Sequence, residues 1–193
     1  DCPLRSSAQH RRGFWEDVRE PFNPKTKWAR GEDGRLAFGC PAEYRFDVVE
    51  PDGGVRRISR KWEPIVVDDE GGDFMAPFAG PIQATRPAYA RILLPTDGRI
   101  WVWPEQPLES VELDEEARAR FGMDRRWQIS TQGAFDVFEA DGTWLGTVEV
   151  PANVRYSAYP TAPPVVIRGD SVWAVTFDDL GVSYVTKHVV DWP

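Results

Sequence analysis

The sequence predicts an all-β fold of short antiparallel strands, and three observations support this class. Asp-Gly pairs recur between apolar runs, at 33–34, 52–53, 97–98 and 141–142. Such pairs are a strong β-hairpin signal, because both central residues of a type I′ turn need positive φ. The 193 residues include 17 Pro and 16 Gly, which favour many short strands over long helices. The stretch 135–151, two apolar runs around one such pair, is echoed at 46–53.

Composition indicates an acidic globular protein. The net charge is −8, which argues against non-specific binding to nucleic acid or to an anionic membrane surface. No apolar run approaches the roughly 20 residues of a membrane-spanning helix, so no membrane span is expected. The chain starts at Asp1 rather than Met, which we interpret as a processed chain, an excised piece or a partial gene product.

The first part of the chain divides into an arm, a four-stranded unit and a loop. Residues 1–26 are expected to form an extended arm, with at most one helical turn at 16–20. The unit 27–62 is predicted to be a meander, its first strand starting at Trp28 and the others at 35–39, 43–49 and 55–60. The loop 63–87 contains four prolines, which prevent a long helix, and a short edge strand is expected at 65–67.

The second unit, 88–151, repeats this pattern with an insertion. Strands are predicted at 89–94 and 99–103 and in the hairpin 135–151. The insertion 104–126 is expected to be irregular apart from a short helix at 114–122, which Asp114 would cap and Gly122 would end. Without the insertion, the Asp-Gly turns are 21 positions apart, against 19 in the first unit. This agreement indicates a structural repeat.

The third unit, 152–193, is predicted to be incomplete. Strands are expected at 163–167, 171–177 and 182–190, and no fourth strand follows. Residues 1–20 of the arm are the only candidate for supplying the missing outer strand.

Several strands are apolar at consecutive positions, as in Ile100-Trp101-Val102-Trp103. A strand with one face in water would alternate, so this run predicts a sheet covered on both faces. The outer strand 55–60 is more polar, as expected for an edge. A two-sheet sandwich, the structural alternative, predicts cleaner alternation.

Four motifs resemble a known family. They are Asp-Gly-Arg-Ile-Trp-Val at 97–102, the hairpin Phe-Asp-Val-Phe-Glu-Ala-Asp-Gly-Thr-Trp-Leu-Gly-Thr-Val-Glu-Val-Pro at 135–151, Arg-Gly-Asp-Ser-Val-Trp-Ala-Val at 168–175 and Leu-Gly-Val-Ser-Tyr-Val at 180–185. Together they resemble the C-terminal half of bacterial six-bladed β-propeller proteins of the NHL-like and TolB-like kind, over about 27–190. The resemblance implies about three blades, at 27–62, 88–151 and 152–193, which make half of a ring. Members of that family are often exported, so a periplasmic or secreted location is expected.

Half of a ring leaves two blade faces uncovered, which monomers rarely tolerate. We therefore expect a homodimer or a missing partner half that completes the ring, or another closed arrangement of the repeats.

Metal and enzyme chemistry have weak signals. The acids at 68–70 and 178–179 could bind Ca²⁺, but neither group has the spacing of a calcium loop, and turn formation is the favoured interpretation. No other cofactor is expected. Some six-bladed propellers are lactonases with a central cation held by Glu, Asn and Asp. Asn23 and Asn153 are the only asparagines here, so a cation-dependent, lactonase-like hydrolase is kept as the alternative function.

Nucleophilic catalysis has less support. His10 lies in the arm, and His188 lies in a predicted strand, where a structural role is favoured over a general base. The chain has no Gly-x-Ser-x-Gly motif, phosphate loop or Cys-x-x-Cys. Cys2 and Cys40 are compatible with a single disulfide and equally with two free thiols.

The sequence offers two candidate interaction surfaces. Tryptophans in the predicted strands could form a platform on which a sugar or a peptide stacks. Core packing is the favoured interpretation, because these residues lie in the middle of strands. They are Trp101, Trp103, Trp144 and Trp173. A partner surface is expected at the exit of the insertion, and also at loop 63–87, because propellers carry binding loops at blade ends. The residues of that exit are Phe121, Met123, Arg125, Arg126 and Trp127. The favoured function is a non-enzymatic binding or scaffold protein, with a protein or small molecule as ligand; a part of a larger protein is the third alternative.

Overall fold

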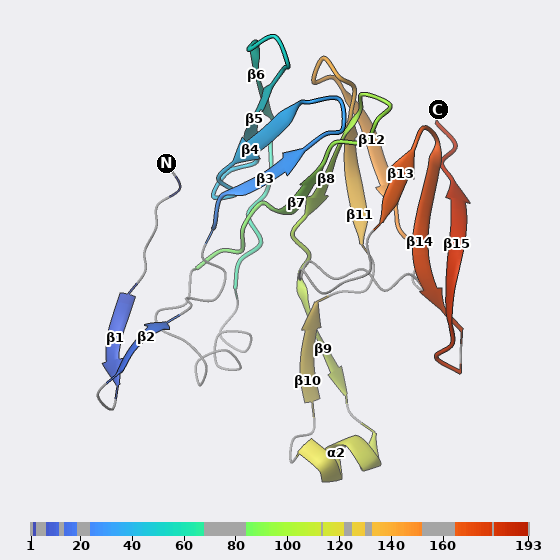
Figure 1. Cartoon of the computed structure of the whole chain (residues 1–193). Helices are drawn as coiled ribbons and strands as arrows, with labels where there is room; N and C mark the ends of the chain where they lie inside the picture. The colour runs from blue at the N-terminus through green and yellow to red at the C-terminus, as the bar shows by residue number, and fades with distance from the viewer. Residues whose placement is uncertain are drawn as a thin grey trace.

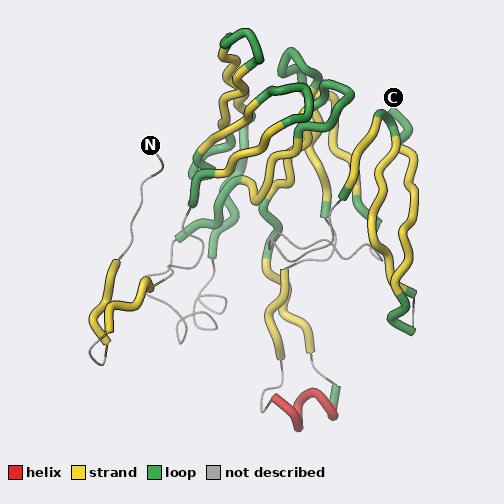
Figure 2. The backbone as a smooth tube through the Cα atoms, viewed as in Figure 1, coloured by secondary structure: helices red, strands yellow, loops and turns green. Residues whose placement is uncertain are grey.

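The computed structural model describes residues 2, 7–11, 14–18, 24–67, 84–112, 114–121, 125–129, 133–151, 165–178 and 180–192. Within these ranges the fold is all-β, with antiparallel sheets and one short helix, α2 (Glu115–Phe121) (Figure 2). No helix of the described residues is long and apolar enough to cross a membrane.

The hairpin turns follow the Asp-Gly pairs but are not the expected type. Glu139 N–H donates to the Thr143 carbonyl (2.8 Å), and Gly142 N–H donates back to Glu139 (3.0 Å). The pair therefore occupies the last two positions of a turn, and Gly142, at φ 91°, takes the left-handed conformation that closes the hairpin. The Asp141 carboxylate accepts the Thr143 N–H at 2.8 Å. The same aspartate bond recurs at Asp33, Asp52, Asp97 and Asp178.

The first unit forms the predicted four-stranded meander, with strands in sequence order. Its strands are β3 (Lys27–Arg30), β4 (Leu36–Gly39), β5 (Arg45–Val49) and β6 (Val55–Ser59). After β6, Val66 makes an isolated bridge to Thr85 where the short edge strand was expected.

The second unit is also a four-stranded sheet, in the order β12-β11-β8-β7. Its strands are β7 (Tyr89–Leu93), β8 (Ile100–Pro104), β11 (Ala134–Phe138) and β12 (Trp144–Glu149). β8 and β11 are neighbours in the sheet, as the repeat predicts, although the insertion separates them in sequence.

The insertion is more regular than predicted. The expected helix is confirmed as α2, but the flanking segments pair as a hairpin, β9 (Leu108–Glu112) with β10 (Arg125–Ile129). Figure 1 shows this hairpin projecting from the sheets with α2 at its tip. The register places Arg125 opposite Glu112 in this hairpin.

The third unit has the three predicted strands and no fourth in the part of it that is described. They are β13 (Val166–Arg168), β14 (Ser171–Phe177) and β15 (Ser183–Val189). The arm does not supply the missing strand within this chain. Its strands β1 (Ser7–Arg11) and β2 (Phe14–Val18) pair with each other, so a helical turn over 16–18 was also a wrong expectation.

A disulfide joins Cys2 of the arm to Cys40, directly after β4, with Cα atoms 5.0 Å apart. Of the two alternatives for the cysteines, the structure has the disulfide. The bond attaches the start of the arm to the first sheet, which is the far side of the molecule from β15 (Figure 1).

The three sheets are stacked as layers, and the second sheet is covered on both faces. One core cluster joins it to the first sheet, and another joins it to the third. On β11, Phe138 (2% exposed) belongs to the first cluster, whereas Phe135 (1% exposed) and Val137 belong to the second. On β8, Val102 and Trp101 divide in the same way. The consecutive apolar residues therefore serve opposite faces, as the sequence predicts.

Truncation on each face of β11 tests this layering. We expect Phe135→Ala and Phe138→Ala each to lower the free energy of unfolding by about 3–5 kcal/mol, because each empties a buried site. Leu180→Ala is the control, since Leu180 is 88% exposed in a turn, and it should cost much less. Urea denaturation measures all three. A cost for Phe135→Ala no greater than for Leu180→Ala would mean that the third sheet does not cover the second.

Candidate functional site

The predicted contact residues lie on the projecting hairpin rather than on an irregular loop. Phe121 ends α2, while Arg125, Arg126 and Trp127 open β10. Met123 lies outside the described residues, as does most of loop 63–87. The backbone places the other four residues together at one tip of the molecule. Whether a partner binds there stays a prediction.

The acidic clusters have a turn role where they are described. The Asp178 carboxylate accepts the backbone N–H groups of Leu180 and Val182, and the Tyr184 hydroxyl donates to it at 3.0 Å. The backbone hydrogen bonds, led by that from Val182, lower the pKa of Asp178 below its ordinary value. Asp179 and residues 68–70 lie outside the described part of the chain. Among described residues, no three His, Cys, Asp or Glu side chains are grouped to hold a metal ion.

The remaining polar candidates separate in space. His10 lies on β1, whereas His188 lies on β15 and lines a cavity described below. Asn23 and Asn153, considered for a lactonase-like cation site, lie outside the described residues.

The strand tryptophans do not form one platform. Trp101 and Trp103 are buried within the second core cluster. Trp144 is half exposed beneath the Arg60 guanidinium, 4.7 Å from its ring centre. Trp173 lies on the outer face of the third sheet, beside Lys187. Core packing is therefore correct for the first pair, and the other two are separate surface features.

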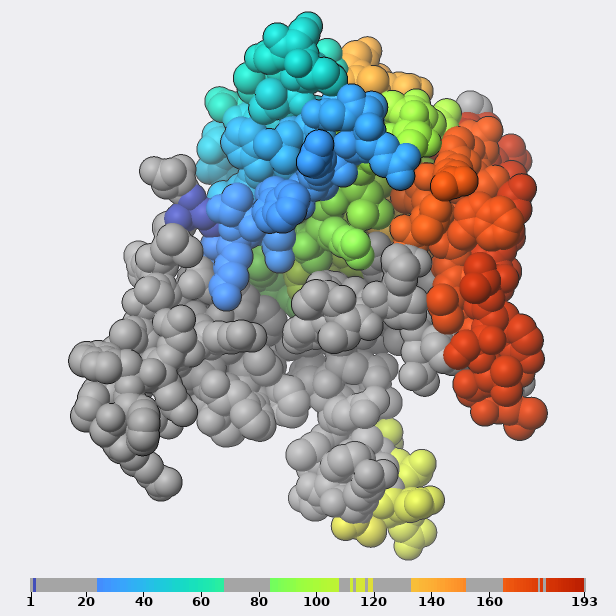
Figure 3. Space-filling view, in the orientation of Figure 1, coloured from blue at the N-terminus to red at the C-terminus, as the bar shows by residue number. Residues whose placement is uncertain are grey.

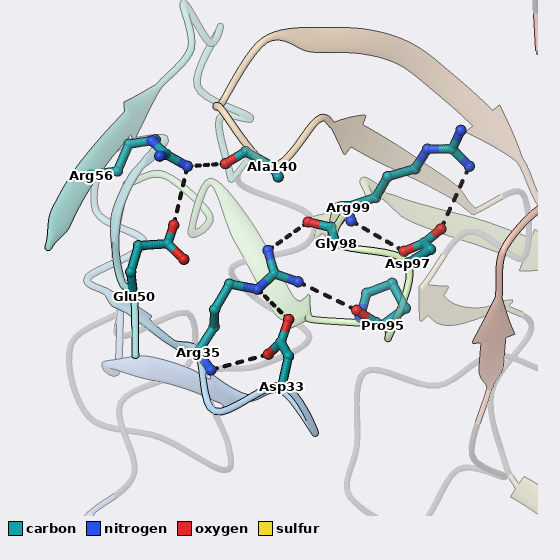
Figure 4. Close-up of polar contacts among 9 residues, drawn as sticks. All are labelled: Asp33, Arg35, Glu50, Arg56, Pro95, Asp97, Gly98, Arg99 and Ala140. Atoms are coloured by element: carbon teal, nitrogen blue, oxygen red, sulfur yellow. Dashed lines mark hydrogen bonds and ion pairs between the residues drawn. The ribbon is translucent and has the colours of Figure 1, made fainter. Parts of the chain in front are cut away.

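The Asp-Gly-Arg turns have a structural role that was not predicted from the sequence: their arginines connect one sheet to the next (Figure 4). Arg35, almost fully buried, donates to the carbonyl oxygens of Gly98 (2.5 Å) and Pro95 (3.3 Å) in the corresponding turn of the second sheet. Asp33 orients its guanidinium through the Nε atom at 2.6 Å. The arginine of one turn thus satisfies the backbone of the next.

Arg99 repeats this contact one sheet further on. It donates to the Asp170 carboxylate at 3.0 Å, in the turn between β13 and β14. Its guanidinium also lies over the ring of Trp192, whose indole N–H donates to the same carboxylate at 2.6 Å. These two hydrogen bonds, that of Arg99 first, lower the pKa of Asp170. Asp170 stands directly before β14, where the other turns have Arg35 and Arg99 directly before β4 and β8.

Buried acids elsewhere are paired and therefore structural. Asp136 on β11 is 1% exposed and accepts hydrogen bonds from Tyr44 (2.7 Å) and Thr147 (2.9 Å), with Arg60 as its ion-pair partner. Burial and the nearby Asp136 charge raise the pKa of Tyr44 above its ordinary value, so Tyr44 keeps its proton and donates. Because Tyr44 and Arg60 belong to the first unit, this cluster is a polar link between the first two layers.

A cavity of about 340 Å³ lies between the second and third sheets. Its walls include Phe135, Val148, Val172 and Ala174, and Glu149 and Asp191 add carboxylates. Two further lining residues are notable.

The lining residues Trp101 and His188 each have a buried ring nitrogen without a hydrogen-bond partner among the described residues, Nε1 and Nε2 respectively. Buried polar atoms are nearly always paired, so these two nitrogens are unmet hydrogen-bonding groups beside the cavity. Sequence reasoning assigned His188 a satisfied structural role, and for its Nε2 atom the structure corrects this.

The outer faces of the stack are uncovered, and each carries exposed apolar side chains beside charged ones. Asp47 pairs with Arg57 next to Phe38, and Lys187 lies beside Trp173. On the first sheet, cross-strand neighbours Trp28 and Phe38 are 71% and 38% exposed. On the third sheet, Val185 and Val189 are 73% and 71% exposed. The space-filling view shows these sheets, blue and orange-red, flanking the green second sheet (Figure 3). Each end face thus exposes large apolar side chains to solvent, mixed with charged ones.

Comparison of the chain with protein-family models, with curated proteins and with solved structures finds no significant match. Function must therefore be argued from the fold, the end faces and the cavity.

Replacing the buried turn arginine tests the link between sheets. We expect Arg35→Lys to lower the free energy of unfolding by about 1–3 kcal/mol, because Lys lacks the fork that reaches both carbonyls and leaves one of them unpaired. Arg57→Lys is the control, since its pair with Asp47 is exposed and such pairs contribute little. Equal effects of the two substitutions in urea denaturation would contradict the assignment.

The link between Arg99 and Asp170 should depend on pH. A carboxyl whose folded-state pKa is lowered stabilises the fold above its unfolded pKa, about 3.9, and loses that contribution as the pH falls through the folded value. We therefore expect the stability difference between the wild type and Asp170→Asn to be constant near neutral pH, to shrink below about pH 4 and to vanish once the pH is below the lowered folded-state pKa. Urea denaturation across this range measures it. In an Arg99→Gln background the difference should shrink, and a difference that grows at low pH would overturn the interpretation.

Proposed function

We propose that the chain is a non-enzymatic binding or scaffold protein of the β-propeller type, completed by further sheets in its assembled form. The observation that carries this proposal is the exposure of large apolar side chains, among charged residues, on both end faces. Exposed apolar surface of this kind marks an interaction site. The second sheet supplies a comparison, because neighbouring sheets cover it on both sides.

The order of strands supports a propeller arrangement. Propeller blades are four-stranded sheets arranged around a central channel. Here the first strands of the three units, β3, β7 and β13, contribute to one groove of about 370 Å³ that includes Ala29, Ile92 and Ile167. Strands of equal rank in the repeat thus share one side of the stack.

A second copy of the chain is the occupant that fits the end faces best. The first sheet of one copy would cover the third sheet of the other, and a two-fold axis would repeat this contact and close the ring. Two copies of a three-sheet stack give the six sheets of the resembled family. In a closed ring both end faces are used, which accounts for the exposed apolar side chains on both.

The disulfide supports a periplasmic or secreted location. Disulfides persist in oxidising compartments and are rare in the cytosol. The bond between Cys2 and Cys40 connects the arm to the sheet that forms one end face.

Charge substitutions on the end faces test the assembly. We expect the 21.9-kDa chain to sediment as a dimer, and both Trp28→Glu and Val185→Glu to give folded monomers, because a closed ring needs each face in both contacts. Leu180→Glu is the control, since Leu180 is 88% exposed in a turn.

Sedimentation velocity across a concentration range distinguishes the outcomes. If Trp28→Glu gives monomers and Val185→Glu leaves the dimer intact, first sheets pair with first sheets and the ring is wrong. A wild type that is a folded monomer at all concentrations would overturn the proposal.

A further inference from the structure

We infer that the cavity between the second and third sheets binds a neutral, compact, mostly hydrocarbon molecule that has a carbonyl oxygen. The inference does not depend on assembly, because the cavity is lined by strands of one chain. It rests on three properties of the lining: volume, charge and unmet hydrogen-bonding capacity.

The volume and the walls set the body of the ligand. At about 340 Å³ the cavity lies in the range of small-molecule sites, which are mostly apolar with a few placed polar groups. Its walls are valines from four strands or their ends, the ring of Phe135 and the methyl group of Ala174, with Val148, Val150, Val165, Val172 and Val190 as the valines. Such walls favour a hydrocarbon body of one ring or a short branched chain.

The charged groups set the net charge of the ligand. Glu149 and Asp191 are the carboxylates of the described lining, which contains neither Lys nor Arg. The whole chain also carries a net charge of −8. An anionic ligand would be repelled without a compensating cation, so the lining discriminates against carboxylates and phosphates.

The buried ring nitrogens set the polar group. The Trp101 Nε1 atom can only donate, so the ligand must offer an acceptor. His188 Nε2 can donate or accept according to its tautomer, and it adds a second position for a polar atom. Trp101 is 0% exposed and its ring is held edge-on against Phe135 and Trp192. The ring is therefore held in place, and an acceptor in the cavity reaches the Nε1 donor only when the side chains that cover it move aside.

Three probes of one shape test these requirements. Acetophenone has the ring and the carbonyl, ethylbenzene lacks the acceptor, and benzoate adds a negative charge. We expect acetophenone to shift the indole N–H signal of Trp101 in ¹H–¹⁵N spectra of the whole chain. Its affinity should exceed that of ethylbenzene by several-fold, as one hydrogen bond provides, and that of benzoate by more.

Variants assign the binding to the cavity. Trp101→Phe keeps most of the ring and should weaken acetophenone binding by roughly tenfold, the worth of one buried hydrogen bond. Trp28→Phe removes an exposed indole N–H on the first sheet and should change nothing. Ala174→Leu fills the cavity, keeps both ring nitrogens and should abolish binding. The monomeric Trp28→Glu variant should bind as the wild type does, which separates this inference from the proposed assembly.

The inference is overturned if acetophenone at millimolar concentration leaves the Trp101 signal unmoved, or if benzoate binds as well as acetophenone. Unchanged affinity in a folded Trp101→Phe or Ala174→Leu variant would overturn it as well. The probe comparison uses the wild type alone, so a variant that fails to fold does not remove the test.

Discussion

The need of the second sheet for cover on both faces organises the molecule. Its strands are apolar at consecutive positions, so neither side can face water without exposing residues such as Trp101 or Phe138. Burial of apolar surface is non-directional and scales with area, and a flat neighbour on each side is the simplest way to provide it. A third layer is therefore required, and two outer faces of similar chemistry follow from using the same repeat three times.

Apolar burial alone would let the layers slide, and the turns supply the register. Arg35 and Arg99 each extend from one layer to the corresponding turn of the next. Asp136 adds a buried polar link between the first two layers, through Tyr44 and Arg60. Hydrogen bonds and ion pairs at the turns and in the core thus fix how the apolar faces of neighbouring sheets are positioned. The cavity lies between the second and third sheets, where two ring nitrogens of the lining residues have no hydrogen-bond partner among the described residues.

Local features of the fold were predictable from sequence, and long-range ones were not. Strand positions, α2 and the double cover of the second sheet follow from turn residues, an aspartate at the start of the helix (Asp114) and consecutive apolar residues, all of which act over a few positions. The partner of Arg35 is 63 residues away, and nothing near Arg35 in sequence indicates Gly98. The cavity likewise brings together Trp101 of the second sheet and His188 of the third, which are far apart in sequence. The unpaired nitrogen of His188 could therefore not be predicted from the residues around it. The hairpin of the insertion was missed because its strands alternate in charge and polarity rather than forming an apolar run.

The replacement of arginine by Asp170 gives the series of layers a direction. Each arginine lies on an earlier layer and its acceptor on a later one, and the last layer has an acceptor but no donor of its own at that place. The layers are consequently not interchangeable parts, even though their strands are alike. A gene rearranged to begin with the third layer would keep every strand, but the third layer would have no turn arginine to bind the turn of the layer that follows it. The order of the layers thus depends on one residue in each repeat, the one directly before the second strand.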